Sequence, residues 1–475
     1  MHGTLPSFDQ APLLELITLD GNGLSGSVPN NLVSGSSSIH LFDLSNNRLT
    51  GPIPVSLNAT VALELLLADN MINHIPNELC NNGDWMNGAV AKYQGCDAIL
   101  CAPHSSSPDG RSVNDTAKCT PCSNTSNTSP YFGSISCQAL VNEREILIEL
   151  FNACHGPNWF RNDFWGSSAD VCAWYGVGCK NGSVVLVNLY ANNMQGTPPS
   201  SLFDLPNLEV LILGSNPINF QFINIAQASN LLEIRLDGTG LTSLKGISGA
   251  QSLTILDVGF NTLEGSLSDE IFQLPNLRVL ILRNNHLSKI PVTWSSLKYL
   301  RILRLDNNRL SGPVPSFSGL STLSYLFLGE NFLTGPIPLN FLEHTTLSLN
   351  VTVDLSQNLI TGMIPWQLTR FQNLNLFLRD NQITAIPEEL CAQSAWNFGD
   401  VGWFGCDAIL CRPGTTSPIG RHGSQFPAGC VACTDPTPEY FGNSTCLPQS
   451  AAGVVNRLLN SFLSMVVTLT LMWYV

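Results

Sequence analysis

Residues 300–315 read Leu-Arg-Ile-Leu-Arg-Leu-Asp-Asn-Asn-Arg-Leu-Ser-Gly-Pro-Val-Pro, and this stretch decides the fold. Its first eleven residues fit the pattern L-x-x-L-x-L-x-x-N-x-L. Leu303 and Leu305 alternate with outward residues, as a short strand with one buried face requires, and the chain turns inward at Leu310. Asn308 closes the strand, where its amide can hydrogen-bond backbone groups of the turn that water cannot reach.

The same pattern recurs along the chain at intervals of 22 to 27 residues within each block. Such a repeat predicts a solenoid, in which each coil buries its apolar side against the next and the asparagines form an internal ladder. Thr239 replaces the asparagine once, and Asn350 and Asn373 stand where a leucine is expected, so we expect irregular coils there. The twelve ladder positions are Asn22, Asn47, Asn70, Asn192, Asn216, Thr239, Asn261, Asn285, Asn308, Asn331, Asn358 and Asn381.

Six repeats continue with glycine, any residue, an apolar residue and proline, as in Gly312–Pro315 and Gly335–Pro338. This pattern resembles the plant-type leucine-rich repeat. The resemblance implies an α/β leucine-rich-repeat solenoid of short parallel strands, with a second short strand in each coil and a convex side that is mostly irregular or 3-10 helical. Two small disulfide-rich modules would accompany this solenoid.

The composition points to a secreted, glycosylated protein. The 475 residues include 15 cysteines, and the net charge of −14 excludes a nucleic-acid-binding protein, which needs basic patches. The chain starts without a signal peptide, and residues 3–6 fit the tail of a repeat, so we expect upstream coding sequence to be missing. The glycosylation sequons are at Asn58, Asn114, Asn124, Asn127, Asn181, Asn350 and Asn443.

Two segments of six cysteines each are copies of one module. The sequence Gly-Cys-Asp-Ala-Ile-Leu-Cys occurs at 95–101 and again at 405–411. One C-x-x-C per module is weak evidence for zinc, so disulfides are favoured; six cysteines allow fifteen connectivities, and sequential pairing is only one of them. The predicted disulfide cysteines are Cys80, Cys96, Cys101, Cys119, Cys122 and Cys137, and then Cys391, Cys406, Cys411, Cys430, Cys433 and Cys446.

A capping element is expected between the two copies. Residues 143–151 are a candidate amphipathic helix, and the segment 172–179 reads Cys-Ala-Trp-Tyr-Gly-Val-Gly-Cys. This region is similar to the N-terminal cap of plant-type repeat proteins, which covers the exposed edge of the first coil. The resemblance implies a disulfide between Cys172 and Cys179. Cys154 is left over, and we expect a buried thiol rather than an intermolecular bridge.

These features predict six segments, in an arrangement that resembles the leucine-rich-repeat surface proteins of diatoms and related algae. The hydrophobic tail is short for a membrane span, and the small residues at 450–453 favour a lipid-anchor signal, with a single membrane span or a solenoid-packed tail as alternatives. The segments are a truncated repeat block (1–79), a first cysteine-rich module (80–137), an N-terminal-type cap (140–182), a nine-repeat solenoid (183–390), a second cysteine-rich module (391–446) and the tail (454–475).

No catalytic chemistry is apparent in the sequence. Residues 21–26 match G-x-G-x-x-G, but a repeat tail follows where a dinucleotide site needs a helix. The eight histidines lack ligand spacing, and no nucleophile-elbow, zinc-protease or phosphate-loop motif occurs. We therefore expect no enzymatic activity, no catalytic residue, no cofactor and no metal.

The concave side of the solenoid is the candidate binding surface, because its strands present outward side chains over about 40 Å. We expect a cell-surface glycoprotein that reaches the plasma membrane or cell wall by secretion and binds an extracellular protein, peptide or glycan; a co-receptor would carry any signal. A structural wall or matrix component and a secreted inhibitor of wall-degrading enzymes are the alternatives. The predicted ligand-binding residues, chosen because aromatic and arginine side chains anchor interfaces, are Arg283, Arg304, Tyr325, Phe327, Phe377 and Arg379.

Overall fold

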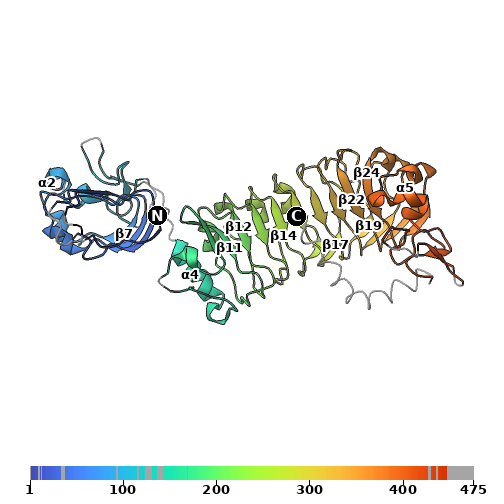
Figure 1. Cartoon of the computed structure of the whole chain (residues 1–475), viewed down its shortest axis with the longest axis horizontal. Helices are drawn as coiled ribbons and strands as arrows, with labels where there is room; N and C mark the ends of the chain where they lie inside the picture. Colours follow the sequence, from blue (N-terminus) through green and yellow to red (C-terminus); the bar gives the residue numbers. More distant parts are fainter. Residues whose placement is uncertain are drawn as a thin grey trace. The chain divides into compact units, whose positions relative to one another are not determined.

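The chain forms two compact units in a computed structural model (Figure 1). The first comprises Met1–Pro157, Arg161–Asn188 and Asp204–Leu208, and the second comprises Asn158–Phe160, Leu189–Phe203 and Glu209–Val475. Within the residues described, no helix is long and apolar enough to cross a membrane, and the predicted tail lies outside them. The structure describes residues 2–8, 11, 13–33, 38–92, 95–114, 117–122, 131–135, 143–167, 169–425, 429–434 and 437–446.

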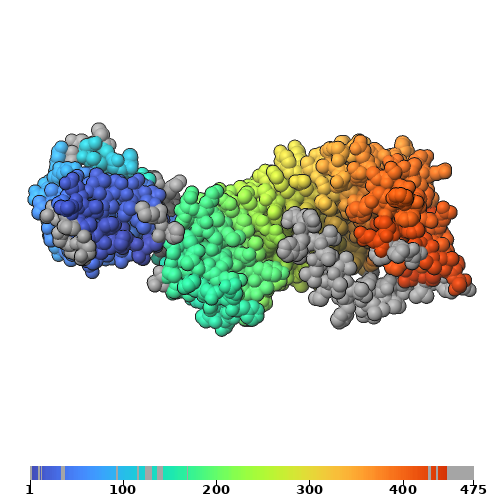
Figure 2. Space-filling view, in the orientation of Figure 1, coloured from blue at the N-terminus to red at the C-terminus, as the bar shows by residue number. Residues whose placement is uncertain are grey.

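The second unit contains a long parallel sheet, which we call the main sheet, and its strands come from successive repeats. Leu280, Leu303 and Leu326 are paired across neighbouring strands and fully buried, which places alternate residues on the outward face. In Figure 2 the colours of this unit change gradually along it in the order of the sequence. Its strands are β12 (Val210–Ile212), β13 (Glu233–Arg235), β14 (Ile255–Asp257), β16 (Val279–Ile281), β18 (Ile302–Arg304), β20 (Tyr325–Phe327), β22 (Asn350–Asp354) and β24 (Asn373–Phe377).

The predicted asparagine ladder is present inside the coils. Asn308 is 5% exposed, and its Nδ2 donates to the carbonyl oxygens of Leu282 at 3.0 Å and Leu305 at 3.1 Å. Its Oδ1 accepts the backbone N–H of Leu287 at 3.1 Å. One amide therefore bonds its own coil and the preceding coil. The same set of bonds recurs at Asn261, Asn285, Asn331, Asn358 and Asn381.

The coils are irregular where the pattern departs from the repeat. Thr239 bonds the carbonyl of Leu236 at 2.9 Å through its shorter side chain. The N–H of Ile218, which an asparagine at position 239 would bond, donates instead to the carbonyl of Asn216 at 2.9 Å. The strands that begin at Asn350 and Asn373 have five residues each, whereas the others in the main sheet have three.

The glycine-proline tails form the second sheet that the resemblance implies. Gly335 and Gly362 have φ angles of +74° and +80°, a region that glycine tolerates best. These strands are β15 (Glu264–Ser266), β17 (His286–Lys289), β19 (Ser311–Pro313), β21 (Phe332–Gly335), β23 (Leu359–Met363) and β25 (Gln382–Ala385). Short 3-10 turns complete the coils, which confirms the predicted fold class: η6 (Ser200–Asp204), η7 (Ile225–Gln227), η8 (Ile247–Gly249), η9 (Asp269–Gln273) and η10 (Trp366–Arg370).

The second cysteine-rich module covers the last coil of this unit. Trp396 is fully buried and its Nε1 donates to the carbonyl of Phe371 at 2.9 Å, while Oδ1 of Asn397 accepts the N–H of Leu376 at 2.7 Å. Its disulfides are Cys391–Cys406, Cys411–Cys430 and Cys433–Cys446. Its elements are η11 (Glu388–Ala392), η12 (Asn397–Gly399), α5 (Asp400–Phe404), η13 (Gly405–Ala408), β26 (Thr415–Thr416) and β27 (Val431–Ala432).

The first unit repeats this plan on a smaller scale. Trp85 corresponds to Trp396 and donates to the carbonyl of Thr60 at 2.9 Å. The disulfides Cys80–Cys96 and Cys101–Cys119 are sequential, and Cys137 lies outside the described residues. The elements are β1 (His2–Thr4), β2 (Leu16–Thr18), β3 (Gly23–Ser27), β4 (Leu41–Asp43), β5 (Arg48–Pro52), η1 (Val55–Ala59), β6 (Glu64–Leu66), β7 (Met71–His74), α1 (Asn77–Cys80), η2 (Met86–Gly88), α2 (Ala89–Lys92), α3 (Cys96–Ile99), β8 (Ser105–Ser106) and β9 (Thr120–Pro121).

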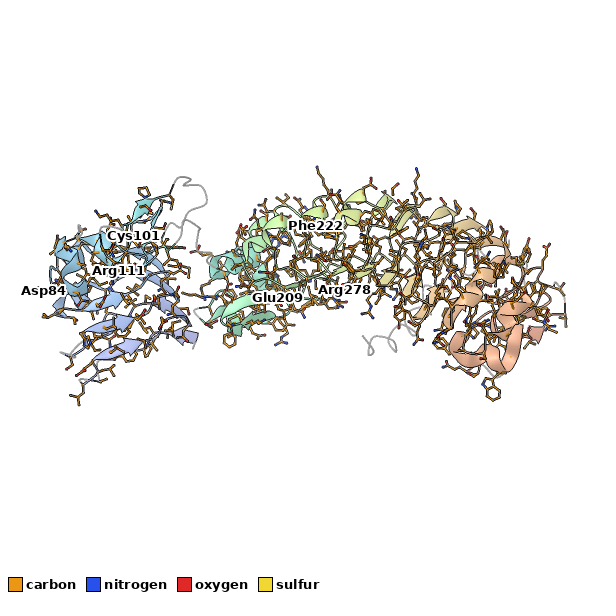
Figure 3. The ribbon with its side chains drawn as sticks, turned by 90° about the horizontal axis from the view of Figure 1, so that it is seen from above. Asp84, Cys101, Arg111, Glu209, Phe222 and Arg278 are labelled. Atoms are coloured by element: carbon orange, nitrogen blue, oxygen red, sulfur yellow. A yellow bond between two sulfur atoms is a disulfide. The ribbon has the colours of Figure 1, made fainter. Side chains whose placement is uncertain are left out.

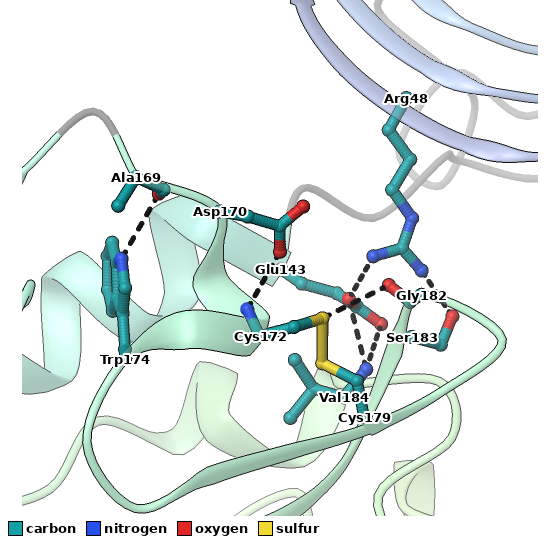
Figure 4. The surroundings of a disulfide bond; sticks show 10 residues. All are labelled: Arg48, Glu143, Ala169, Asp170, Cys172, Trp174, Cys179, Gly182, Ser183 and Val184. Atoms are coloured by element: carbon teal, nitrogen blue, oxygen red, sulfur yellow. Dashed lines mark hydrogen bonds and ion pairs between the residues drawn. A yellow bond between two sulfur atoms is a disulfide. The ribbon is translucent and has the colours of Figure 1, made fainter. Parts of the chain in front are cut away.

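The region of the expected cap also belongs to the first unit. It contains the disulfide Cys172–Cys179, beside which buried Glu143 accepts the N–H of Val184 at 3.2 Å (Figure 4). Cys154 is fully buried, and burial raises the pKa of its thiol to about 12. The elements are α4 (Glu143–Ala153), η4 (Gly156–Asn158), η5 (Val171–Ala173), β10 (Val177–Lys180) and β11 (Ser183–Asn188).

The sequons differ in accessibility. Asn443 is 2% exposed and its Nδ2 donates to the carbonyl of Tyr440. Its glycosylation stays a prediction, because a sequon encodes a chemical acceptor and not its burial. Asn124 and Asn127 lie outside the described residues. The exposed acceptors are Asn58, Asn114, Asn181 and Asn350.

Candidate functional site

Four of the predicted ligand-binding residues lie together on the outward face of the main sheet. Arg304 in β18 is paired with Phe327 in β20, and Tyr325 is two residues earlier on the same strand. Arg283 follows β16, which pairs with β18. We call Arg283, Arg304, Tyr325 and Phe327 the aromatic–arginine cluster. Three neighbouring strands therefore present it as one continuous patch.

The geometry of the cluster is fixed by stacking and by ion pairing. The guanidinium of Arg304 lies over the ring of Phe327, 4.8 Å from its centroid. Two of its nitrogens donate to Asp306 at 3.0 and 3.1 Å, which holds the guanidinium in a planar, bidentate arrangement. The rings of Tyr325 and Phe327 are nearly parallel, with an interplanar angle of 9° and centroids 6.4 Å apart. A ligand would meet a preformed surface, which lowers the entropy lost on binding.

Phe260 extends the cluster, although it is not among the ligand-binding residues predicted from the sequence. Its ring is 4.7 Å from the guanidinium of Arg283, and the residue is 50% exposed. Its φ angle of +54° is costly for a bulky side chain. Burial, and then the positive charge of Arg304, lower the pKa of Arg283 below its usual value. The signal in the sequence was a phenylalanine directly before Asn261, where other repeats have residues such as Asn284 that tolerate positive φ.

The two remaining predicted residues contact the second cysteine-rich module. Arg379 donates from Nη1 to the carbonyl of Pro418 at 2.9 Å. The ring of Phe377 lies 6.3 Å from that of Phe398 and 5.4 Å from the guanidinium of Arg421. Asp354 in β22 separates Phe377 from Phe327 in the register of the sheet. The structure thus places Phe377 and Arg379 in contacts that hold the module, outside the aromatic–arginine cluster.

Carboxylates are interspersed with the arginines on this face. Burial raises the pKa of Asp237, of Asp257 and of Asp354 above the usual range. Burial also raises the pKa of Glu330, and the neighbouring carboxylates add to this effect. In Asp354, hydrogen bonds from Ser356 oppose the effect of burial. A ligand that brings a positive charge close to these groups would favour their ionised form.

A smaller hollow of about 290 Å³ lies in the first unit, between repeat residues such as Ser45 and module residues such as Asp109. Arg111 lines it and pairs with Glu64 at 2.9 Å; Figure 3 labels Arg111 beside Cys101. Throughout the described ranges, no three His, Cys, Asp or Glu side chains are placed to hold a metal ion.

Comparison with known families agrees with this architecture. The sequence model of the leucine rich repeat matches residues 251–310, and a second leucine rich repeat model matches residues 38–59. The fold of this chain is a leucine-rich-repeat solenoid. The leucine-rich-repeat chain is 34% identical over 110 residues to Receptor-like protein 50 of Arabidopsis thaliana, a match that covers 20% of this chain and 12% of that protein.

Solved structures that resemble this leucine-rich-repeat protein come from plants. A plant ice-binding protein has a TM-score of 0.40 at 25% identity and covers 51% of this chain and 87% of its own. The plant peptide hormone receptor RGFR1, in complex with RGF2, has a TM-score of 0.40 at 20% identity, with 83% of this chain and 56% of the receptor covered. The Arabidopsis receptor kinase HAESA, with the peptide hormone IDA and the co-receptor SERK1, has a TM-score of 0.38 at 21% identity. The match covers 82% of this chain and 54% of HAESA.

Proposed function

We propose that this protein works outside the cell as a recognition protein that binds a protein or peptide ligand on the outward face of its main sheet. The aromatic–arginine cluster carries the proposal. Aromatic and arginine side chains are the commonest energetic anchors of protein interfaces, and here Arg304 and Phe327 are stacked on each other on adjacent strands before any ligand arrives.

Two further observations support an extracellular role. Cysteine pairs are joined as disulfides in both modules and in the region of the expected cap, and such bonds persist in oxidising compartments. Exposed acceptors such as Asn58 and Asn181 are available for glycosylation on that route. Attachment to the membrane, with a co-receptor that carries the signal, completes the proposed role.

The test uses the full chain, produced in a secretory host and panned against a displayed random-peptide library. Peptides selected on the wild-type protein should bind the variant Arg304→Glu/Phe327→Ala at least about 100-fold more weakly, since two anchors of roughly 2 kcal/mol each are lost. The control Lys298→Glu/Leu339→Ala makes the same change in charge and also truncates an apolar side chain, in segments that connect the coils. Selected peptides that bind both variants like the wild type would refute the proposed site.

A structural role in a wall or matrix is the second candidate function. The residue that favours it is Trp366, which is 57% exposed on a 3-10 turn away from the main sheet. Retention of the wild-type protein and of Arg304→Glu/Phe327→Ala in purified wall to the same extent, together with no saturable peptide binding, would favour this role.

A further inference from the structure

A second hollow lies beside the N-terminal ends of strands in the main sheet, which form one long border of the sheet. Its volume is about 510 Å³. Leu232, Thr254 and Arg278 hold the same position in three successive repeats, because their N–H groups donate in turn to the carbonyls of Glu209, Leu232 and Thr254. Ser252 and Asn276, which complete the lining with Tyr299, stand two residues before Thr254 and Arg278. Tyr299 stands two residues before Arg301, the equivalent position of the next repeat. We call this hollow the edge groove.

The charge at this repeat position changes along the solenoid, at Arg278 within the lining of the edge groove and at Glu209 and Arg301 just beyond it. Glu209 takes the equivalent position before β12, whereas Arg278 and Arg301 take it before β16 and β18. Figure 3 shows Glu209 and Arg278 on the same side of the ribbon and Phe222 on the opposite side. The N–H of Arg301 donates to the carbonyl of Arg278 at 2.8 Å, so the two arginines are immediate neighbours.

The two arginines are available to a ligand. Both are exposed, and neither forms an ion pair within the described part of the chain. They belong to a local excess of positive charge, since residues 278–309 hold seven Lys and Arg against one acidic residue, Asp306, in a chain of net charge −14. An anionic group placed between two adjacent guanidinium groups gains charge-assisted hydrogen bonds from both.

The rest of the lining suits a sugar better than a peptide. Ser252, Thr254 and Asn276 each donate to a backbone carbonyl, which leaves their oxygens as acceptors for sugar hydroxyls. Tyr299 is 55% exposed, with a ring that can pack against the C–H face of a saccharide. The backbone N–H of Arg278 is already bonded within the sheet at 2.8 Å, as are those of its neighbours. A peptide therefore finds no free strand edge to pair with, and recognition must come from side chains.

We propose that the edge groove binds an acidic oligosaccharide, with Arg278 and Arg301 on its carboxylate or sulfate groups and Tyr299 under a sugar ring. This site is separate from the aromatic–arginine cluster and does not depend on the function proposed for that cluster. Because the attraction is electrostatic, affinity should fall steeply with added salt.

The probes are a uronate hexasaccharide, a heparin-derived sulfated hexasaccharide and a neutral dextran hexasaccharide, titrated calorimetrically into the full chain. At least one acidic probe should bind and dextran should not, and which acidic probe binds identifies the anionic group. Arg278→Gln/Arg301→Gln should weaken binding on the order of 100-fold, since each arginine supplies charge-assisted hydrogen bonds. Tyr299→Ala should weaken it about 10-fold.

The matched control is Lys289→Gln/Arg309→Gln, which removes two exposed positive charges near the second sheet. It should bind the acidic probe within about twofold of the wild type. Equal losses in the two double variants, no binding of either acidic probe at 1 mM, or equally tight binding of hexaglutamate would each overturn the proposal. Arg304→Glu/Phe327→Ala should leave oligosaccharide binding unchanged, which separates this site from the proposed peptide site.

Discussion

Replacing one rung of the asparagine ladder tests how the solenoid is held together. In Asn308→Ala the N–H of Leu287 loses its partner. The carbonyls of Leu282 and Leu305 lose one bond each and keep those from Asn285 and Asn331. These three leucines are at most 2% exposed, so water cannot replace the amide. The orphaned N–H costs about 2 kcal/mol and each of the two lost bonds to a carbonyl costs about 0.5 kcal/mol, which gives a loss of about 3 kcal/mol in the free energy of unfolding.

The loss can be measured globally and locally. Urea unfolding followed by tryptophan fluorescence gives the change in stability, and hydrogen exchange gives the protection of the Leu287 amide. A cost of about 3 kcal/mol corresponds to roughly 100-fold faster exchange of that amide. Asn308→Thr should lose about 0.5 kcal/mol less, since Thr239 shows that a hydroxyl keeps one bond to a carbonyl and does not bond the backbone N–H.

Asn219→Ala is the matched control, because the amide of Asn219 is exposed and bonds only a surface hydroxyl, that of Thr197 at 3.4 Å. Its stability should stay within about 0.5 kcal/mol of the wild type. If Asn308→Ala behaves like this control and the Leu287 amide keeps its protection, the ladder does not stabilise the coils and the reasoning fails.

Three further predictions concern single side chains. Phe260→Asn should raise the free energy of unfolding by about 0.5 to 1 kcal/mol in chemical denaturation, since asparagine relieves the strain of the positive φ angle while a stacking contact with Arg283 is lost. Cys154 should resist iodoacetamide at pH 8 in the native protein, as counted by mass spectrometry, because burial raises its pKa to about 12. Burial raises the pKa of folded Asp354, so folding takes up a proton there and stability falls as the pH rises above about 4; Asp354→Asn should therefore stabilise the protein in thermal unfolding at pH 7 and not at pH 3.

Each of these has its own control or contradicting outcome. Phe260→Leu keeps a side chain at the strained φ angle and should bring no gain in stability, so an equal gain from Phe260→Leu would contradict the strain argument. Cys154 should react within minutes in guanidinium chloride, and rapid native labelling would contradict its burial. An equal change in stability at pH 3 and pH 7 in Asp354→Asn would remove burial of the carboxylate as the cause.

The solenoid could be predicted from the sequence because each coil is decided locally. The leucines around Asn308 specify a strand, a turn and a buried amide within eleven residues, and stacking repeats this solution. The sequence also marked Thr239 as a departure, and the structure shows the altered backbone bond of Ile218 beside it. The repeat pattern thus predicted both the solenoid and the position of an irregular coil.

The candidate site was harder to predict. Contacts with the cysteine-rich module, which is not a repeat, decide which of the outward residues are left for a ligand. Phe377 and Arg379 fit the outward pattern as well as Phe327 does, but Phe398 and Pro418 of the cysteine-rich module contact them. Nothing in the repeat pattern encodes that packing. Phe260 could have been noticed in the sequence, since a bulky residue stands where the turn needs a positive φ angle. The repeat pattern does not show the energetic cost of that angle, because this cost depends on the backbone conformation.

The second cysteine-rich module is anchored to the final coil through Phe371 and Leu376. Because most neighbouring coils are joined by the same set of asparagine bonds, a coil can be inserted or deleted within the stack while the contacts of the module with Phe371 and Leu376 stay unchanged. One inserted coil would widen the main sheet by about 4.8 Å. Genetic recombination can thereby change the width of the main sheet in fixed steps while the terminal cysteine-rich module stays the same.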